Sequence, residues 1–168
     1  MKLYYLLLSL IFLLSIGIRY YQFTKVPLGL YIDDVSIGYN AASILNTGKD
    51  EYGVRLPFAL KAFGEYKMPV YIYLTSLSIA AFGVNDFAVR FPSLLFSILT
   101  IVVFYLLLKE LVEVDSTFLP KKNRNIFLLL GTFLFGISPW HVMLSRAGFE
   151  VTVGLFFYTL SCYLFLSF

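Results

Sequence analysis

Long apolar runs dominate this chain and restrict it to folds that a lipid bilayer can accommodate. Hydrophobic residues make up 60% of the 168 residues and charged residues 14%, and the mean hydropathy is +0.83. A helix needs roughly 20 predominantly apolar residues to cross the hydrocarbon core. Runs of about this length cover residues 3–21, 91–108, 126–145 and 151–168. The sequence therefore predicts an all-α membrane protein of one domain, residues 1–168, with about four transmembrane helices.

The ends of the chain and its rarer residues narrow the class further. No small-residue cleavage pattern follows the first run at Arg19 and Tyr20, so we expect a retained membrane anchor rather than a signal peptide. Cys162 is the sole cysteine, which excludes an intramolecular disulfide. The 13 Lys and Arg residues are scattered and the net charge is only +3, which excludes nucleic acid as a partner. No polar residues follow the last apolar run, residues 151–168, so we expect the chain to be the N-terminal part of a longer protein.

A shorter apolar segment, residues 69–82, decides the expected topology. As a helix its 14 residues reach about 21 Å, less than the roughly 30 Å of hydrocarbon. If it rests on the membrane instead of crossing it, the basic loop 109–125 lies in the cytoplasm, as positively charged short loops usually do. We therefore expect a juxtamembrane helix there, a cytoplasmic N-terminus, and residues 19–90 and 139–150 on the extracytoplasmic side.

The outer loop contains a polar island, residues 31–68, with two adjacent acids, Asp33 and Asp34, near its start. Helical spacing of apolar residues predicts a second juxtamembrane helix at residues 34–46. The partial positive charge of a helix N-terminus favours ionised carboxylates, which suits a base or a metal ligand. Two alternatives stay open: Asp34 only caps the helix, or the whole island is a solvated loop.

Two cations lie where they could meet an anion beside this island. Lys67 precedes Pro69, the first residue of the predicted helix, and helix N-termini attract phosphate. Arg90 precedes the second transmembrane run and could form a two-pronged phosphate contact. We expect both to bind a phosphate-bearing lipid of the membrane. The alternative is that each side chain only extends to lipid headgroups.

Several short motifs, taken in order, resemble those of one enzyme family. They are YIDD at residues 31–34, GYNA at 38–41, TGKDEYG at 47–53, LP at 56–57, the set Glu65, Lys67 and Pro69, FAVRFPS at 87–93 and SRAGFE at 145–150. Together they resemble the polytopic GT-C glycosyltransferases typified by protein O-mannosyltransferases and aminoarabinose transferases. The resemblance covers nearly the whole chain, although family members usually continue through several more spans.

The resemblance implies a hexosyl or pentosyl transferase that takes its sugar from a polyprenyl-phosphate carrier. The acceptor would be a lipid, glycan or protein at the extracytoplasmic face of a bacterial cell membrane. Asp33 matches the leading catalytic acid, a general base or acceptor-orienting group. Asp34 matches a second catalytic position that is usually glutamate. Lys67 and Arg90 would offset charge on the departing donor phosphate.

The same resemblance makes Glu65 and Glu150 candidates for metal or acceptor contacts, with a divalent metal as a candidate cofactor. Glu150 also lies four residues after Arg146, so a helical ion pair would explain both residues without catalysis. His141 is the single histidine, and we expect it to pack at the membrane interface.

Two other classes of function compete with the enzyme. One is a noncatalytic subunit that binds the lipid carrier or assists assembly, since the chain could bear the acids without the rest of a catalytic cavity. The other is a transporter fragment, in which helix-breaking residues would lie at mid-membrane. Gly131, Gly136 and Gly154 are the candidates for such breaks, and close helix contacts explain them equally well.

Overall fold

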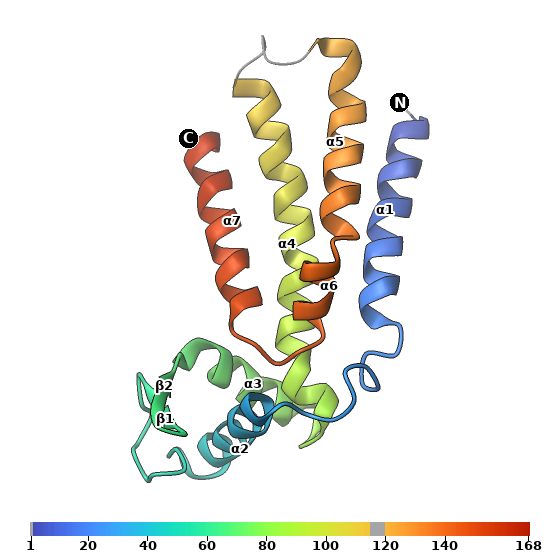
Figure 1. Cartoon of the computed structure of the whole chain (residues 1–168). Helices are drawn as coiled ribbons and strands as arrows, with labels where there is room; N and C mark the ends of the chain where they lie inside the picture. Colours follow the sequence, from blue (N-terminus) through green and yellow to red (C-terminus); the bar gives the residue numbers. More distant parts are fainter. Residues whose placement is uncertain (1, 115–119) are drawn as a thin grey trace.

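A computed structural model describes residues 2–114 and 120–168. Within these residues the chain forms seven helices and one two-stranded antiparallel hairpin (Figure 1). The helices are α1 (Lys2–Tyr20), α2 (Ile32–Thr47), α3 (Pro69–Phe82), α4 (Asp86–Val114), α5 (Lys121–Gly136), α6 (Pro139–Ser145) and α7 (Val151–Ser167), and the strands are β1 (Leu60–Ala62) and β2 (Glu65–Lys67). The predicted all-α class is confirmed.

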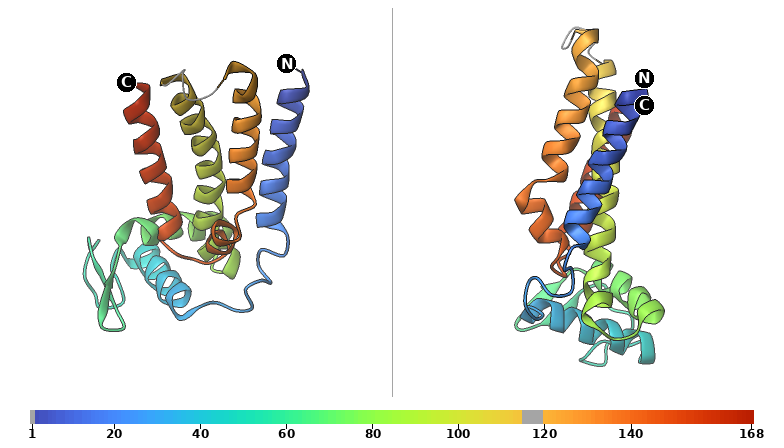
Figure 2. Two further views of the ribbon diagram at one scale, coloured as in Figure 1. Left: turned by 45° about the horizontal axis from the view of Figure 1, so that its top comes forward. Right: turned by 90° about the vertical axis from the view of Figure 1, so that its right-hand side faces the viewer.

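Four long helices stand side by side in the order α7, α4, α5, α1, as Figures 1 and 2 show. Helix α4 packs against both α7 and α5, and α1 packs against α5. The start of α1 and the end of α7 lie at one end of this bundle, whereas α2, α3 and the hairpin gather at the other (Figure 1). The loop between α6 and α7 also reaches this second end, so the two segments that we expected on one side of the membrane do meet there.

Two helices of the described residues, α1 and α4, are each long and apolar enough to cross a membrane. The predicted span 126–145 is wrong as a single helix, because α5 and α6 are separate and bent by 50°. Pro139 has no backbone N–H to continue the helix and instead occupies the first turn of α6. If the bent pair counts as one span there are three candidates, while the 17-residue α7 as a fourth span stays a prediction.

The predicted basic loop 109–125 is shorter than expected. Helix α4 continues to Val114, and Lys109 lies on it, 3.9 Å from Glu113 of the next turn. Helix α5 begins at Lys121, and residues 115–119 of the predicted loop lie outside the described residues. Both helix ends are at the end of the bundle opposite α2 and α3 (Figure 1).

Within the island, α3 covers the same residues as the predicted helix 69–82, and α2 extends the predicted helix 34–46 by a few residues. Gly48 ends α2 in the left-handed conformation, with φ of 70°. The hairpin of β1 and β2 was not predicted. Its turn places both Phe63 and Gly64 at positive φ, 49° and 89°, and its strands are too short to produce a recognisable alternation.

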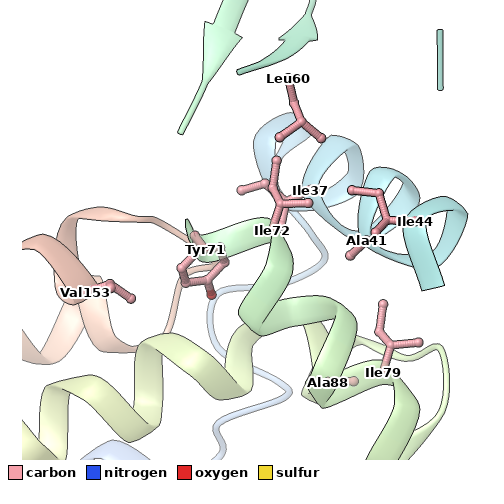
Figure 3. Close-up of a cluster of buried hydrophobic side chains, with 9 residues drawn as sticks. All are labelled: Ile37, Ala41, Ile44, Leu60, Tyr71, Ile72, Ile79, Ala88 and Val153. Atoms are coloured by element: carbon pink, nitrogen blue, oxygen red, sulfur yellow. The ribbon is translucent and has the colours of Figure 1, made fainter. Parts of the chain in front are cut away.

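A buried apolar cluster joins the island to the bundle (Figure 3). It consists of Ile37, Ala41, Ile44, Leu60, Tyr71, Ile72, Ile79, Ala88 and Val153, which come from α2, β1, α3, α4 and α7. Burial of one such aliphatic side chain contributes roughly 1.5–3 kcal/mol. Helix α2 and strand β1 of the island are therefore packed against α3 and the ends of α4 and α7, so the island as a whole is not a solvated loop, although residues 51–56 are exposed.

Two of the three glycines considered as transporter-like breaks lie at helix contacts. A Cβ atom at Gly136 would overlap the Ser15 hydroxyl of α1, and one at Gly131 would lie 2.7 Å from a methyl group of Leu108 in α4. At Gly154 an added Cβ would meet no atom within 4 Å. Close helix packing accounts for the first two positions.

Candidate active site

The adjacent acids Asp33 and Asp34 lie in the first turn of α2, and their side chains differ in exposure and in their contacts. Successive side chains on a helix are about 100° apart, which follows from 3.6 residues per turn. The side chain of Asp34 is completely buried, whereas that of Asp33 is 42% exposed. The two carboxylates therefore have different partners and different access to a substrate.

Asp33 forms an ion pair with Lys67 of β2. The Lys67 ammonium lies 2.5 Å from Asp33 Oδ1 and 3.4 Å from Glu65 Oε1. Glu65 and Lys67 are two residues apart on a strand and so project from the same face of the hairpin. Burial lowers the pKa of Lys67, but its contacts with Asp33 and Glu65 outweigh this effect and the net shift is upward. Lys67 is therefore a nearly buried cation that is paired with a partly exposed carboxylate.

Asp34 forms a buried ion pair with Arg90 of α4. Arg90 Nε lies 3.5 Å from Asp34 Oδ2, and both side chains are fully buried. The guanidinium also donates to the backbone carbonyls of Pro27 and Gly29. Asp34 Oδ1 accepts the backbone N–H of Gly148 at 2.9 Å. This pair thus joins α2, α4, the segment before α2 and the loop before α7.

Burial raises the pKa of Asp34, and the backbone N–H groups of Gly148 and Tyr31, together with Arg90, oppose that rise. The N–H of Tyr31 lies 3.3 Å from Asp34 Oδ2, so the capping alternative is present as one part of this network. A buried carboxylate is stable only when its oxygens are paired, and here the two N–H groups and the guanidinium contact them.

The geometry does not support the phosphate contact predicted for Arg90. Its guanidinium is enclosed by Asp34 and two carbonyl groups and has no exposed surface, so it reaches neither a bound phosphate nor a lipid headgroup. Asp34 is enclosed in the same way and has no exposed surface. Of the four residues predicted to act on the substrate, Asp33 is partly exposed, Lys67 is nearly buried beside it, and Asp34 and Arg90 are fully buried.

The loop 146–150 packs directly against the start of α2. A Cβ atom at Gly148 would lie 2.8 Å from Asp34 Oδ1, so this close approach requires glycine. The next residue, Phe149, stacks on Tyr31 with ring centroids 5.8 Å apart. Arg146 donates to the backbone carbonyls of Ile18 and Tyr21. These contacts, and not a helical ion pair with Glu150, explain the arginine at this position.

An apolar groove of about 370 Å³ runs between α3 and α7 beside these groups. Its lining consists of Met68, Pro69, Val70, Tyr71, Glu150, Val151, Val153, Gly154 and Phe157. Glu150 is the one charged residue in that lining, and Met68 directly follows Lys67. Burial raises the pKa of Tyr71, whose hydroxyl donates to the carbonyl of Val89 at 3.0 Å. The groove therefore follows the start of α3 and the start of α7, and its first lining residue, Met68, is the chain neighbour of Lys67.

The residues that the structure describes contain no group of three or more His, Cys, Asp or Glu that could hold a metal ion. Glu65 contacts Lys67, and Glu150 lies in the groove lining at the start of α7. The divalent metal that the resemblance implies stays a prediction, and neither glutamate is assigned to it.

Arg19 and His141 form a polar contact that the sequence did not indicate. Arg19 Nη2 lies 2.8 Å from His141 Nδ1, and both side chains are completely buried. The ring of His141 also packs on Phe135, with centroids 4.6 Å apart, so the predicted packing role is only part of its environment.

In comparisons with known proteins, no family model, curated protein or solved structure matches this chain. The proposed function therefore depends on the ordered motifs and on the geometry of the site.

Proposed function

We propose that the chain carries the donor end of an integral-membrane glycosyltransferase of the GT-C type. The enzyme transfers a hexose or pentose from a polyprenyl-phosphate carrier to a lipid, glycan or protein acceptor at the extracytoplasmic face of a bacterial membrane. The observation that carries the proposal is the contact between Asp33 and Lys67, 2.5 Å apart, at the end of the bundle where the resembling motifs meet.

Asp33 is the general base in this reaction. The acceptor hydroxyl attacks the anomeric carbon while its proton passes to the Asp33 carboxylate. The bond between that carbon and the phosphate oxygen breaks, and its electron pair leaves with the carrier phosphate. Asp33 is suited to this role because its side chain is 42% exposed. General-base assistance of this kind is commonly worth about 10²- to 10⁴-fold.

Lys67 stabilises the departing phosphate. A lysine ammonium has three donors, so it can hold Asp33 and a phosphate oxygen at the same time. The contact at 3.4 Å with Glu65 is the longer of its two ion pairs and is the one that an entering phosphate would replace. Charge stabilisation by a fixed cation acts mainly in the transition state, where negative charge builds up on the leaving group.

Asp34 and Arg90 hold the site in place instead of touching the substrate. Their ion pair fixes the first turn of α2 against α4, and the Gly148 N–H adds the loop before α7. Because Asp33 and Asp34 are adjacent on one rigid turn, fixing Asp34 also fixes the direction of Asp33.

The groove between α3 and α7 supports a lipid-linked donor. Its wall is apolar apart from Glu150, as a polyprenyl chain requires, and it includes Met68, the residue that follows Lys67 in the chain. A carrier lying in it would place its phosphate near the ammonium without leaving the membrane surface.

A noncatalytic carrier-binding subunit is the second candidate, and one observation favours it. Asp33 is already committed to Lys67 at 2.5 Å, so its Oδ1 is occupied until a ligand competes for the lysine. Such a protein would bind the carrier phosphate and transfer no sugar.

Membranes containing the protein, incubated with a panel of radiolabelled hexosyl- and pentosyl-polyprenyl phosphates, test the proposal. We expect release of the carrier phosphate coupled to labelling of an acceptor, and a loss of both in Lys67→Gln. The control is Lys49→Gln, an exposed lysine in the same island. Binding of the donor by the wild type without any transfer would contradict the enzyme and favour the binding subunit. Unchanged binding and transfer in Lys67→Gln would contradict the phosphate site.

A further inference from the structure

We infer that Arg19 and Arg146 form a reciprocal clamp that fixes the loop 146–150 against Asp34, and that both are positioning residues for the transfer reaction. The catalytic part of this inference rests on the proposed function. Its structural part concerns the contacts between α1, α5 and α6 and can be tested without any substrate.

The first half of the clamp is Arg19, which caps α5 from the end of α1. Its Nη1 donates to the carbonyl of Gly136 at 2.7 Å and to that of Ser15 at 2.9 Å. Gly136 is the last residue of α5, and the final carbonyl groups of a helix have no partner within it. A buried cation at this position also interacts favourably with the helix dipole.

His141 is a further contact of Arg19. Arginine can only donate hydrogen bonds, so His141 Nδ1, 2.8 Å from Arg19 Nη2, is the acceptor and the imidazole is neutral. Since His141 belongs to α6 and Gly136 to α5, a single guanidinium bridges the bend between these two helices. The planar fork of arginine permits this, and a lysine ammonium does not reproduce its geometry.

The second half is Arg146, which follows α6 and caps α1. Its Nη2 lies 2.6 Å from the carbonyl oxygen of Ile18 and 2.6 Å from that of Tyr21. Helix α1 ends at Tyr20, so these are again carbonyl groups at a helix end. Arg19 therefore ties the end of α1 to α5 and α6, and Arg146 ties the end of α6 back to α1.

The clamp reaches the candidate active site through two residues of chain. Gly148 follows Arg146 by two positions and donates its N–H to Asp34 at 2.9 Å. On its far side the loop is held by Ser93, whose hydroxyl donates to the carbonyl of Phe149 at 3.1 Å. Loss of the clamp would free the near side of the loop and, with it, a hydrogen bond that orients the first turn of α2.

Hydrogen–deuterium exchange of the detergent-solubilised protein tests the structural part. In Arg19→Gln and Arg146→Gln, we expect exchange of the peptide covering residues 145–150 to rise by about tenfold or more, because its anchoring donors are lost. Peptides from the middle of α4 should keep their protection, which shows that the fold persists. The control is Arg55→Gln, an exposed arginine of the island. If either replacement reduces folding, Arg19→Lys and Arg146→Lys serve instead, and we expect them to recover little of the protection of the loop.

Sugar transfer tests the catalytic part. We expect each arginine variant to lower kcat while leaving the KM for the lipid donor within about twofold, because the clamp contacts neither groove nor phosphate. Effects of Arg146→Gln and Asp34→Asn should be less than additive, since both act through the same hydrogen bond. Unchanged exchange at residues 145–150 would overturn the clamp. Increased exchange with full turnover would overturn its positioning role. A wild type that transfers no sugar would contradict the proposed function, and the hydrogen–deuterium exchange would then test the clamp by itself.

Discussion

At the scale of single residues, the structure separates two acids that the sequence presents as a pair. Asp33 is partly exposed and meets Lys67, whereas Asp34 is buried and meets Arg90. Exposure distinguishes the two acids, so in the proposed reaction Asp33 is the one that takes the proton of the acceptor. Arg90 is also fully buried, so the proposal gives it a structural role instead of a contact with the substrate.

Asp34→Asn should destabilise the protein much more than Asp33→Asn. The change leaves Arg90 charged and buried without a counterion, and removing one partner of such a pair costs about 3–5 kcal/mol. Asp33 is 42% exposed, and Glu65 still contacts Lys67 when Asp33 is replaced, so the loss costs less. Thermal unfolding in detergent measures the difference, with Asp86→Asn on the exposed start of α4 as a control. Equal losses in the two variants would argue against the buried pair.

The pair of Lys67 and Asp33 predicts a pH dependence at the alkaline end. The pKa of Lys67 is raised in the folded protein, so the folded chain binds this proton more tightly than the unfolded chain does. The stabilisation is therefore complete below the ordinary lysine pKa of about 10.4 and is lost as the pH rises through the raised value. Unfolding midpoints in urea at a series of pH values should show this loss in the wild type and a smaller one in Lys67→Gln. The same alkaline slope in both proteins would contradict the pairing.

At the scale of elements, the sequence predicts what its local signals encode. Pro69 and Gly83 frame α3 at the expected residues, and long apolar runs indicate α1 and α4. The break between α5 and α6 could not be predicted from the sequence, because the apolar run continues through Pro139. In the structure, the Arg19 guanidinium contacts the carbonyl of Gly136 at this bend.

Contacts between distant residues could not be predicted, and these determine the site. Arg19 and His141 are 122 residues apart in the chain, and Gly148 and Asp34 are 114 apart. Each of these residues has an ordinary local explanation, such as an interfacial cation or a turn glycine. Asp33 and Lys67 could be proposed because their motifs resemble a family, while their direct contact required the structure.

Two glycine replacements test how tightly the loop before α7 packs on α2. Gly148→Ala would bring a Cβ to 2.8 Å from Asp34 Oδ1, so the loop or the carboxylate must move. We expect a destabilisation of about 1–3 kcal/mol, which is usual for overpacking, and a lower rate of transfer. In Gly154→Ala the added methyl group meets no atom within 4 Å, so stability should be unchanged or slightly higher. Thermal unfolding of both variants checks this, and no loss in Gly148→Ala would refute the close contact.

At the scale of the whole molecule, the bundle brings the island and the loop 146–150 to one end, opposite the end of α4 and the start of α5 (Figure 1). This arrangement agrees with a membrane topology in which the site faces outward and the basic residues near α5 face the cytoplasm. The side of the membrane to which each end belongs is open to direct measurement.

Single cysteines at Lys49 and Asn123, in a background without Cys162, test this topology. Both positions are exposed, the first in the island and the second at the start of α5. An impermeant thiol reagent should label Lys49→Cys in intact cells, and should label Asn123→Cys only after the membrane is opened. Labelling of both from outside would contradict the proposed orientation.

The proposed mechanism depends most on Asp33 as the base for sugar transfer from a polyprenyl-phosphate donor. The most direct measurement is the single-turnover rate of Asp33→Asn compared with the wild type, with Asp86→Asn as the matched control. The replacement keeps the size of the side chain and removes its basicity, so we predict a fall of about 10²- to 10⁴-fold with donor binding retained. An Asp33→Asn variant that transfers sugar at the wild-type rate would contradict the role of Asp33 and the mechanism built on it.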